Sequence, residues 1–363
     1  MNIGIPKERR AFEYRVGMSP AGVQMLSSQG HICYIEHDAG LGAGFSDQEY
    51  EQAGGRIAYS PHEVFGRADL LLKVARPMID EIEWLRPGTA IAGLLHLGSA
   101  RTDKIDALLE NNITAIAYEQ IQLEDGTVPV RRPLSQIGGR LAAQIAARLM
   151  QNDAGGKGIL LGGVAGVPPA EVVIIGAGIA GTCATQAFLG MGAHVTVLDV
   201  NFNALERIFE KAPGIVTMVY NPVNVARVCA YADVVVGAVL VPGERPPIVV
   251  TREIVRAMKP RAIIMDISID EGGCVETSRP TTHEHPTFIE EGTIHYCVPN
   301  MPSIVARTST YAFLNAAFPF IQELVNKGIE KAIAENRAIE HGIATYQGEF
   351  RHLSHLSTME PQE

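Results

Sequence analysis

The sequence has few charged side chains, no regular cysteine spacing and no basic stretch. Asp, Glu, Lys and Arg make up 19% of the 363 residues, against about 25% in an average domain, so we expect apolar surface that partner subunits cover. The five cysteines form no C-x-x-C pair, which argues against a disulfide framework and a zinc site. The net charge of −10 argues against nucleic acid or an anionic membrane as a partner, because both repel an acidic surface.

Signatures of targeting, of hydrolases and of metal sites are also absent. The N-terminus has no basic region followed by an apolar run, so we expect a cytoplasmic protein rather than a secreted one. The sequence contains no G-x-S-x-G, no P-loop and no H-E-x-x-H. Two histidine pairs, His283 with His285 and His352 with His355, match no helical metal-binding pair with a placed carboxylate, so no metal is expected.

Short apolar runs alternate with helix-length segments through the whole chain, whose length predicts about two domains. This alternation is typical of parallel sheets with right-handed helical crossovers. Ser19-Pro20 is a good helix start, and a further helix is expected over 102–110. The expected strands lie at 3–5, 32–35, 70–74, 90–95 and 113–118 in the first half, and at 172–175, 195–198, 234–238 and 262–267 in the second.

A dinucleotide-binding motif, Gly176-Ala177-Gly178-Ile179-Ala180-Gly181, follows the strand 172–175 and opens a helix. Its first glycine permits the tight turn, its second lets amides approach a pyrophosphate, and its third lets helix and strand pack closely. The next strand ends in Asp199, eighteen residues after Gly181, near the spacing of about 20 expected for a ribose-binding carboxylate. That carboxylate would repel a 2′-phosphate, so NAD is favoured over NADP. A glycine-rich turn without a ligand is the alternative.

We therefore predict an α/β protein with two doubly wound parallel-sheet domains. A helix over 136–150 and a glycine-rich segment over 153–166 separate the two sheets. After Pro302, apolar residues at helical spacing predict helices that fold back onto the first domain. The predicted boundaries are 135–303 for a Rossmann NAD-binding domain, inserted in a discontinuous substrate domain made of 1–130 and 305–363. The tail from about Tyr346 is polar.

Candidate reactive groups follow strands in both halves of the sequence. His96 follows the strand 90–95, and Asp270 follows the strand 262–267. A His and an Asp that face each other across a dinucleotide cleft would form an acid/base pair suited to amine, imine and carbonyl interconversion. Arg15 and Lys73 could each hold a substrate carboxylate. A structural role for His96 and a solvated state for the two cations are the alternatives.

Further segments, in order along nearly the whole chain, match one known family. They are Gly4 to Glu8, Glu13 to Val16, Ser19 to Val23, Ala68 to Val74, Leu95 to Leu97, Gly139 to Gln144, Gly237 to Gly243, Asp266 to Gly273, Ser278 to Thr282, Asn300 to Pro302 and Thr308 to Tyr311. In these segments and in the dinucleotide turn, the chain resembles the NAD-dependent L-alanine dehydrogenases. That family is related to the NAD-binding subunit of the proton-pumping transhydrogenase.

The resemblance implies reversible oxidative deamination of L-alanine to pyruvate and ammonia, with hydride passing to NAD. His96 would bind substrate and act as acid/base, Asp270 would handle proton transfer and water at the imine stage, and Arg15 would hold the carboxylate. Lys73 and Arg76 are further candidate substrate contacts. The implied cofactor contacts are Ser135, Gly176, Gly178, Ile179, Ala180, Gly181, Asp199, Val239, Leu240, Ile267, Ile269, Val298, Asn300 and Met301. The family forms hexamers, so we expect a homohexamer.

The chain departs from the family at one informative place. Alanine dehydrogenases usually read Lys-Val-Lys-Glu-Pro, whereas this chain reads Lys73-Val74-Ala75-Arg76-Pro77, so the family's second lysine, a carboxylate contact, is Ala75. Losing one partner of a desolvated charged contact typically costs ~2–5 kcal/mol, enough to weaken alanine binding by a factor of about a hundred or more. Arg76 could substitute only if the chain turns there, because adjacent side chains of an extended segment point to opposite faces. Alternatively, Ala75 makes room for a larger or differently charged substrate.

Three functions are compatible with this sequence. The first is an alanine dehydrogenase with an altered carboxylate clamp. The second is a related amino-acid dehydrogenase or imine reductase that acts on a different substrate. The third is a non-catalytic NAD-binding subunit or an NAD sensor, which would have no use for Arg15, His96 and Asp270 together.

Overall fold

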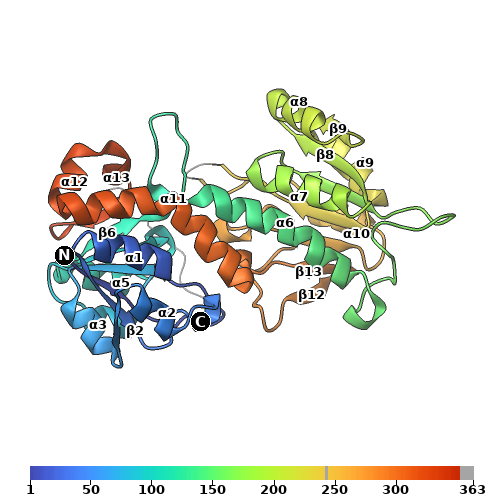
Figure 1. The fold of residues 1–363 in the computed structure, drawn as a ribbon. Coiled ribbons are helices and arrows are strands. Elements are labelled where there is room, and N and C mark those ends of the chain that lie inside the picture. The colour runs from blue at the N-terminus through green and yellow to red at the C-terminus, as the bar shows by residue number, and fades with distance from the viewer. Residues whose placement is uncertain (242–243, 352–363) are drawn as a thin grey trace. The chain divides into compact units, whose positions relative to one another are not determined.

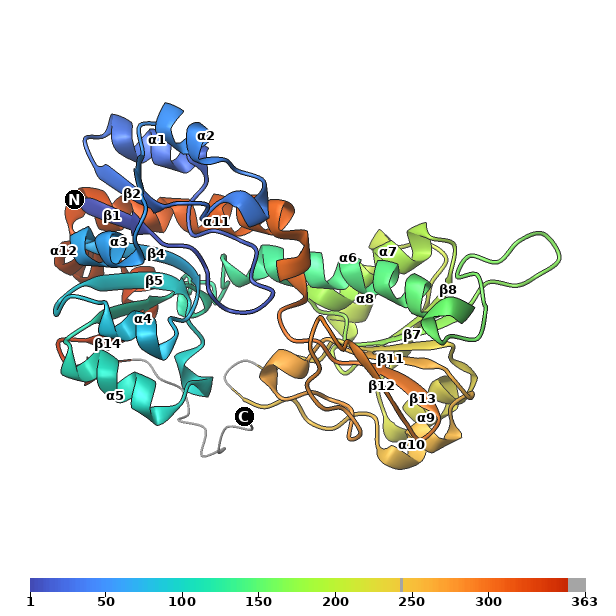
Figure 2. The same ribbon diagram turned by 90° about the horizontal axis from the view of Figure 1, so that it is seen from below.

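The structure is a computed structural model, and it describes residues 1–241 and 244–351. The chain divides into two compact units, one made of Met1–Leu134 with the chain from Ser303 onward, the other made of Ser135–Pro302. Each unit has its own mostly parallel sheet with helices packed on it (Figures 1 and 2). The predicted α/β class with two doubly wound sheets is confirmed.

The described part of the first unit carries an 8-stranded sheet in the order β15-β14-β6-β5-β4-β1-β2-β3. The strands from β1 to β6 pair in parallel, and β14 and β15 add an antiparallel edge that the sequence did not predict. The strands are β1 Asn2–Ile5, β2 Ile32–Glu36, β3 Arg56–Ala58, β4 Leu70–Ala75, β5 Ala90–Leu94, β6 Thr114–Ala117, β14 Ile343–Tyr346 and β15 Glu349–Phe350.

Helices cover both faces of this sheet, as the alternation along β4 shows. Leu70, Leu72 and Val74 pack in a core with side chains of α1 and α11, whereas Leu71 packs on the other face with side chains of α3, α4 and α5. Figure 2 shows α11 and α5 on opposite sides of the strands. The helices are α1 Pro20–Ser28, α2 Asp47–Gln52, α3 Pro61–Arg67, α4 Ile79–Glu83, α5 Thr102–Glu110, α11 Ala306–Lys327, α12 Ile329–Glu335 and α13 Arg337–His341.

Two predictions about these helices are confirmed. The Ser19 hydroxyl accepts a hydrogen bond from the Gly22 amide at 3.3 Å, with Pro20 as the first residue of α1. The helices that follow Pro302 do return to the first sheet, because Phe313 and Ile321 of α11 lie in the same core as Ile3 of β1.

The second unit has a 7-stranded sheet in the order β12-β13-β11-β10-β7-β8-β9, in which only the β12–β13 pair is antiparallel. Its strands are β7 Glu171–Ile175, β8 His194–Asp199, β9 Val216–Val219, β10 Val234–Gly237, β11 Ile263–Asp266, β12 Thr287–Glu290 and β13 Thr293–Tyr296. Its helices are α6 Arg131–Leu149, which begins in the first unit, α7 Ile179–Gly190, α8 Phe202–Lys211, α9 Pro222–Tyr231 and α10 Arg252–Ala257.

The register of this sheet brings several loops to one edge. Ile175 pairs with both Leu198 and Gly237, and Gly237 pairs with Asp266. Because these strands are parallel, the segments that follow β7, β8, β10 and β11 leave the sheet at the same edge. Ligands of doubly wound folds bind at such carboxyl edges.

The uncharged stretch 172–197 forms strand, helix and strand, since it covers most of β7, all of α7 and most of β8. Among the described residues, no helix is long and apolar enough to cross a membrane.

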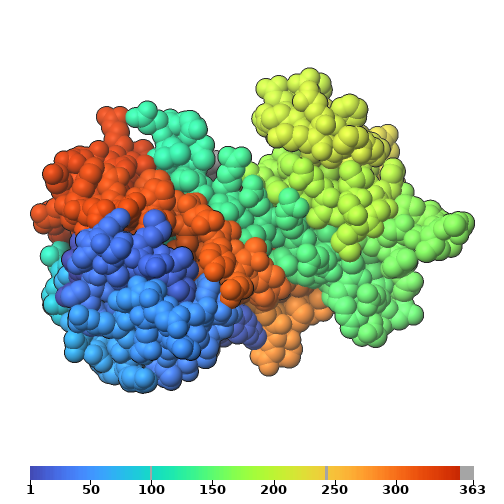
Figure 3. Space-filling model, in the orientation of Figure 1, coloured from blue at the N-terminus to red at the C-terminus, as the bar shows by residue number. Residues whose placement is uncertain are grey.

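Apolar side chains are exposed on and around α8 and β9, at the edge of the sheet of the second unit. Val200, Phe202, Phe209, Val219 and Val223 each expose between 48% and 77% of their surface. Figure 3 shows α8 standing out at the surface of this unit. The apolar surface expected from the low charge content is therefore present here.

Candidate active site

The glycine-rich turn joins β7 to α7 in the conformation that its sequence predicts. Gly176 has a φ of +109°, and a Cβ on it would overlap the carbonyl oxygen of Ala238. A Cβ on Gly181 would overlap the carbonyl oxygen of Gly176, whereas one on Gly178 would meet no atom within 4 Å. The turn is thus packed against protein on one side and open at Gly178, beside the first amides of α7, where a pyrophosphate can approach.

Asp199 ends β8 next to this turn. Its Oδ2 accepts a hydrogen bond from the Ala177 amide at 2.6 Å, and its Oδ1 accepts one from the Asn201 amide at 2.7 Å. These two bonds keep the half-buried carboxylate at the carboxyl edge of the sheet, where it can accept hydrogen bonds from ribose hydroxyls. The residues present therefore fit a bound dinucleotide.

Asp266, at the end of β11, organises the loop that carries Asp270. Its carboxylate is buried, and burial raises its pKa above the ordinary value for aspartate. It accepts hydrogen bonds from the amides of Ser268, Cys274 and Val275 at 3.1, 2.9 and 3.1 Å. The segment 267–273 is closed into a compact loop by these three bonds.

Ser268 connects that loop to the segment that follows β10. Its hydroxyl accepts a hydrogen bond from the Val239 amide at 2.9 Å and donates to the Gly237 carbonyl at 3.3 Å. The predicted cofactor contacts Val239 and Ile267 are thereby held at one edge, and Leu240 is 53% exposed beside them.

Asp270 lies at an exposed position at the carboxyl edge of β11. Its Oδ1 accepts a hydrogen bond from the Asn300 amide at 2.9 Å, so the two segments after β11 and β13 are joined. Asn300 has a positive φ of 56°. Of the predicted contacts around it, Ile269, Val298 and Met301 are buried.

Ser135 and Ala180 come from neighbouring helices. A Cβ on Gly139, one turn after Ser135 in α6, would overlap the carbonyl oxygen of Ala180, so α6 packs closely on the start of α7. Ile179 is 42% exposed at this helix start. Asp199 and Val239 thus lie with the glycine turn at the carboxyl edge of the sheet, and the roles of the predicted cofactor residues stay predictions.

His96 follows β5 in the first unit and has the left-handed backbone conformation, with φ 43° and ψ 46°. The Leu95 and His96 amides donate to the two carboxylate oxygens of Glu119, at 3.1 and 2.6 Å. Arg76 Nη1 donates to the His96 carbonyl at 3.0 Å. The main chain of His96 is therefore held by side chains on both of its sides, while the residue itself lies at an exposed position.

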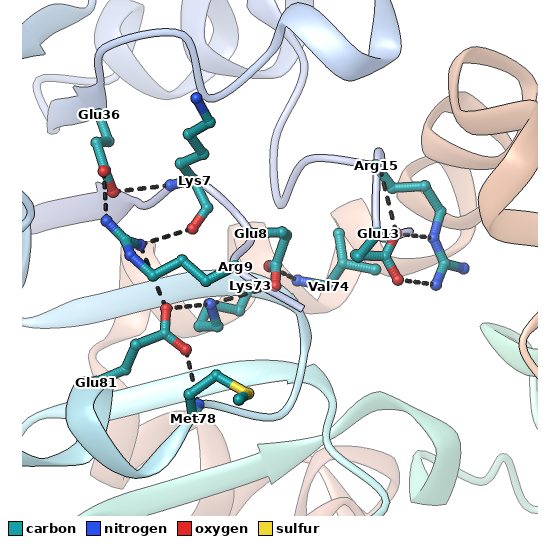
Figure 4. Close-up of polar contacts among 10 residues, drawn as sticks. All are labelled: Lys7, Glu8, Arg9, Glu13, Arg15, Glu36, Lys73, Val74, Met78 and Glu81. Atoms are coloured by element: carbon teal, nitrogen blue, oxygen red, sulfur yellow. Dashed lines mark hydrogen bonds and ion pairs between the residues drawn. The ribbon is translucent and has the colours of Figure 1, made fainter. Parts of the chain in front are cut away.

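Arg15 is buried and paired with Glu13. Its Nε lies 2.7 Å from Glu13 Oε1, and its Nη2 lies 2.5 Å from Oε2 (Figure 4). The loop that carries Arg15 packs against β4, because a Cβ on Gly17 would overlap the Leu72 carbonyl oxygen. Glu13 thus fixes the guanidinium through two parallel bonds, the geometry that gives the strongest pairs.

Lys73 is fully buried in β4 between two carboxylates. Its Nζ lies 2.8 Å from Glu81 and 3.2 Å from Glu8, and all three side chains are at most 2% exposed (Figure 4). Burial lowers the pKa of Lys73, but the two carboxylates outweigh it, so the net pKa is raised. Burial raises the pKa of Glu8. The structure brings Lys73 together with Glu8 and Glu81, and its contact with substrate stays a prediction.

Ala75 is buried and is the last residue of β4, where it pairs with Leu94 of β5. Arg76 is therefore the first residue after the strand. That side chain is half-buried and extends to the carbonyl of His96. Burial, followed by the charge of Arg10, lowers the pKa of Arg76, whereas Glu119 raises it.

The expectation that no metal is bound is not tested by this structure. Among the described residues, His37, Asp38 and Asp47 form one group whose possible ligand atoms lie within 4.8 Å of one another. Hydrogen bonds account for this group, since His37 Nδ1 lies 2.5 Å from Asp47 Oδ2 and the Asp38 amide donates to Asp47 Oδ1. His352 and His355, like Pro242 and Gly243 of the matched segment 237–243, lie outside the described residues.

Sequence reasoning missed the carboxylates that hold the candidate residues. Glu8 and Glu13 lie in the segments that carry the family resemblance, but no role was predicted for them. Asp266 also lies in such a segment, with no role predicted, whereas Glu81 and Glu119 had no local signal. A lysine within an apolar strand implies a buried counter-charge, so a carboxylate partner for Lys73 could have been predicted, although not which one.

Comparisons with known proteins agree with this geometry. The family models "Alanine dehydrogenase/PNT, N-terminal domain" and "Alanine dehydrogenase/PNT, C-terminal domain" match residues 4–138 and 142–353. An alanine dehydrogenase of Mycolicibacterium smegmatis is 45% identical over 96% of this chain and 94% of its own length. A solved L-alanine dehydrogenase has a TM-score of 0.94 and 39% identity, and covers 97% of each chain.

A second solved structure, the transhydrogenase from Sinorhizobium meliloti, has a TM-score of 0.81 and 25% identity, and the match covers 97% of this chain and 99% of that one. The resemblance inferred from the sequence motifs is thereby confirmed. This chain belongs to the alanine dehydrogenase/PNT family.

Proposed function

We propose that this protein is an NAD-dependent alanine dehydrogenase. It converts L-alanine, NAD⁺ and water to pyruvate, ammonium, NADH and a proton, and it catalyses the reverse reaction. The observation that carries this function is the similarity to alanine dehydrogenases, at 41–45% identity along nearly the whole chain. These relatives do not favour the two alternatives, a different amino-acid substrate and a non-catalytic NAD-binding subunit.

We assign NAD binding to the second unit. NAD⁺, when bound, accepts a hydride from the substrate Cα in the deamination direction. Asp199 would bind the adenosine ribose, and the amides at the open side of Gly178 would face the pyrophosphate. The other proposed contacts are Ser135, Gly176, Ile179, Ala180, Gly181, Val239, Leu240, Ile267, Ile269, Val298, Asn300 and Met301.

We assign substrate binding to the first unit, with Arg15 as the contact for the substrate carboxylate. A guanidinium has five N–H donors, and Glu13 accepts hydrogen bonds from two of its nitrogens. Glu13 therefore orients Arg15, whose planar guanidinium is of the type that recognises a carboxylate through paired N–H donors. Lys73 and Arg76 stay predictions as substrate contacts.

His96 and Asp270 are the proposed acid/base residues. His96 would exchange a proton with the substrate oxygen. Asp270 would transfer protons to and from water at the imine stage of the reaction. His96 stands at an exposed position on a fixed main chain. Asp270 is also at an exposed position, and its carboxylate is oriented by the hydrogen bond that it accepts from the Asn300 amide.

The test is the initial rate of NADH oxidation with ammonium and pyruvate, glyoxylate, 2-oxobutyrate or longer and dicarboxylic 2-oxo acids, with NADPH in parallel. We expect pyruvate with NADH to give the highest kcat/KM. Asp270→Asn and His96→Ala should each abolish turnover and leave NADH fluorescence titrations nearly unchanged, because neither touches the glycine turn. Turnover by either variant at the parent rate would remove that residue from the mechanism, and no turnover of pyruvate by the parent would refute the function.

We further propose that the protein works as a homohexamer in the cytoplasm. Support comes from the exposed apolar side chains near β9 and from the five cysteines, all buried and free, as in proteins of a reducing compartment. Light scattering on the eluting protein should give the mass of six chains, and a monomer mass would refute the assembly. Fractionation of the native host would locate it.

A further inference from the structure

The main chain of His96 forms hydrogen bonds with two oppositely charged side chains. Glu119, which follows β6, accepts hydrogen bonds from the Leu95 and His96 amides at 3.1 and 2.6 Å. Arg76, which follows β4, donates to the His96 carbonyl at 3.0 Å. β4, β5 and β6 are neighbours in the sheet, so all three residues leave at the same edge.

His96 needs this support because its backbone is in the left-handed region, with φ 43°. That region is unfavourable for a residue with a Cβ, and such residues persist only where the surroundings hold them. A relaxed backbone at this position would carry the imidazole away from its present place. Holding both ends of the residue therefore fixes the side chain that does the chemistry.

The charges of Arg76 and Glu119, which hold the His96 main chain, also attract each other. Glu119 is buried, and Arg76 is a nearby positive charge that interacts with it. Further cations, Arg10 and Lys104, surround Arg76, and burial together with Arg76 and Arg10 lowers the pKa of Lys104. Because Arg10 and Lys104 repel Arg76, its hydrogen bond to the His96 carbonyl helps to keep its side chain in this position.

We propose that Arg76 and Glu119 are positioning residues, which act as a pair to hold the main chain of His96 in the conformation required for acid/base catalysis. Arg76 stands where alanine dehydrogenases usually have glutamate, so this half of the pair distinguishes the chain from its family. In this role Arg76 acts through His96, in place of the substrate contact that the sequence predicts for it. The proposal rests on the proposed function, in which His96 exchanges protons with the substrate.

The test compares Arg76→Met, Arg76→Lys, Glu119→Gln and the Arg76→Met/Glu119→Gln double variant. Arg86→Met is the matched control, because Arg86 also donates to a main-chain carbonyl, that of Ala68 at 2.8 Å, but has no contact with His96 among those described. Each protein is measured for kcat, for the KM of pyruvate, for NADH binding by fluorescence and for its melting temperature.

We expect Arg76→Met to lower kcat by ~10–100-fold, the usual effect of a small misplacement of a catalytic group, with the KM of pyruvate within about twofold. Arg76→Lys should recover much of kcat, because it keeps a charged N–H donor. The double variant should lose about as much as the worse single variant, since both residues hold the backbone of the same residue, His96, from its two sides. Arg86→Met should match the parent.

An activity-independent arm separates this proposal from the proposed function. Diethyl pyrocarbonate modification followed by peptide mass spectrometry gives the rate at His96, with His62 as internal reference. We expect that rate to change by more than about threefold in Arg76→Met and Glu119→Gln, because the conformation that sets the environment of the ring is released. Inactivity of the parent toward pyruvate would refute the proposed function and leave this arm in force.

Three results would overturn the proposal. A raised KM for pyruvate at unchanged kcat in Arg76→Met would make Arg76 a substrate contact. Additive losses in the double variant would show that Arg76 and Glu119 do not act as a pair. An unchanged modification rate of His96 in both single variants would show that its conformation does not depend on them.

Discussion

Replacing Lys73 with methionine tests the buried ion group in β4. Methionine nearly fills the same volume, so the main change is the loss of a charge that lies 2.8 Å from Glu81 and 3.2 Å from Glu8. After the change, Glu81 still has Arg9 at 3.4 Å and the Met78 amide at 2.7 Å, and Glu8 still has the Val74 amide at 2.6 Å. Two carboxylates would then be buried together without their shared cation.

Removing one partner of a buried ion pair typically costs ~3–5 kcal/mol. Glu8 can take up a proton, since its pKa is already raised, and Glu81 keeps Arg9. The lower end of that range, ~3 kcal/mol, is therefore expected. At ~2–4 °C per kcal/mol for a domain of this size, the melting temperature of the first unit should fall by about 6–12 °C.

Circular dichroism melts of the parent, Lys73→Met and the control Lys327→Met measure this fall. Lys327 makes ion pairs of similar length with Glu323 and Glu335, 2.7 and 3.1 Å, but is 39% exposed. The control should lose at most about 1 kcal/mol. Adding Glu8→Gln and Glu81→Gln to Lys73→Met should restore part of the stability, because the uncompensated charges are removed. A loss no larger than that of Lys327→Met would refute the reasoning, and a raised KM for pyruvate at parental stability would make Lys73 a substrate contact.

Three further predictions concern single positions. Burial raises the pKa of Glu8 above its usual 4.5, so the folded state takes up the Glu8 proton at a higher pH than the unfolded state does. As the pH falls from neutral to 4.5, the parent should therefore gain stability relative to Glu8→Gln. A stability difference between the two proteins that does not change with pH in guanidinium denaturation would contradict this. Asp199→Ala should raise the KM for NAD and relax discrimination against NADP, because it removes both the ribose carboxylate and the acceptor of the Ala177 amide; a variant as NAD-selective as the parent would place the specificity elsewhere. Ala75→Lys should lower the KM for L-alanine by as much as about a hundredfold, because it returns the cation whose loss costs ~2–5 kcal/mol; an unchanged or higher KM in initial-rate assays would contradict a simple loss.

The parallel centres of both sheets could be predicted, because their strands are short apolar runs separated by helices. The antiparallel edges could not. β12, Thr287–Glu290, has two apolar residues in four and no buried one, and β15 is two exposed residues long. Edge strands are short and partly polar, so their pattern resembles that of a loop until the neighbouring strand is known.

The candidate site likewise has a part that could be predicted from the sequence and a part that could not. The glycine turn and Asp199 depend on local spacing, and the structure places them side by side, with the Ala177 amide bound to Asp199. The partners of Lys73, Arg76 and His96 come from other elements of the sheet. Which carboxylate meets which cation is decided by strand order, and the sequence predicted the strands but not the pairing of Glu81 or Glu119.

The hydrogen bond between Arg76 and the His96 carbonyl changes how the departure from the family at Ala75 is interpreted. Lysine to alanine removes one positive charge, but glutamate to arginine at the next position replaces a negative charge with a positive one. These two positions together are therefore more positive by one charge than the usual family pattern, and Arg76 donates a hydrogen bond to the His96 carbonyl. A substrate carboxylate that has lost a direct contact still experiences the attraction of Arg76 at longer range. The loss of the lysine is thus compatible with alanine as the substrate, provided that Arg15 makes the direct contact and Arg76 supplies the field and the support for His96.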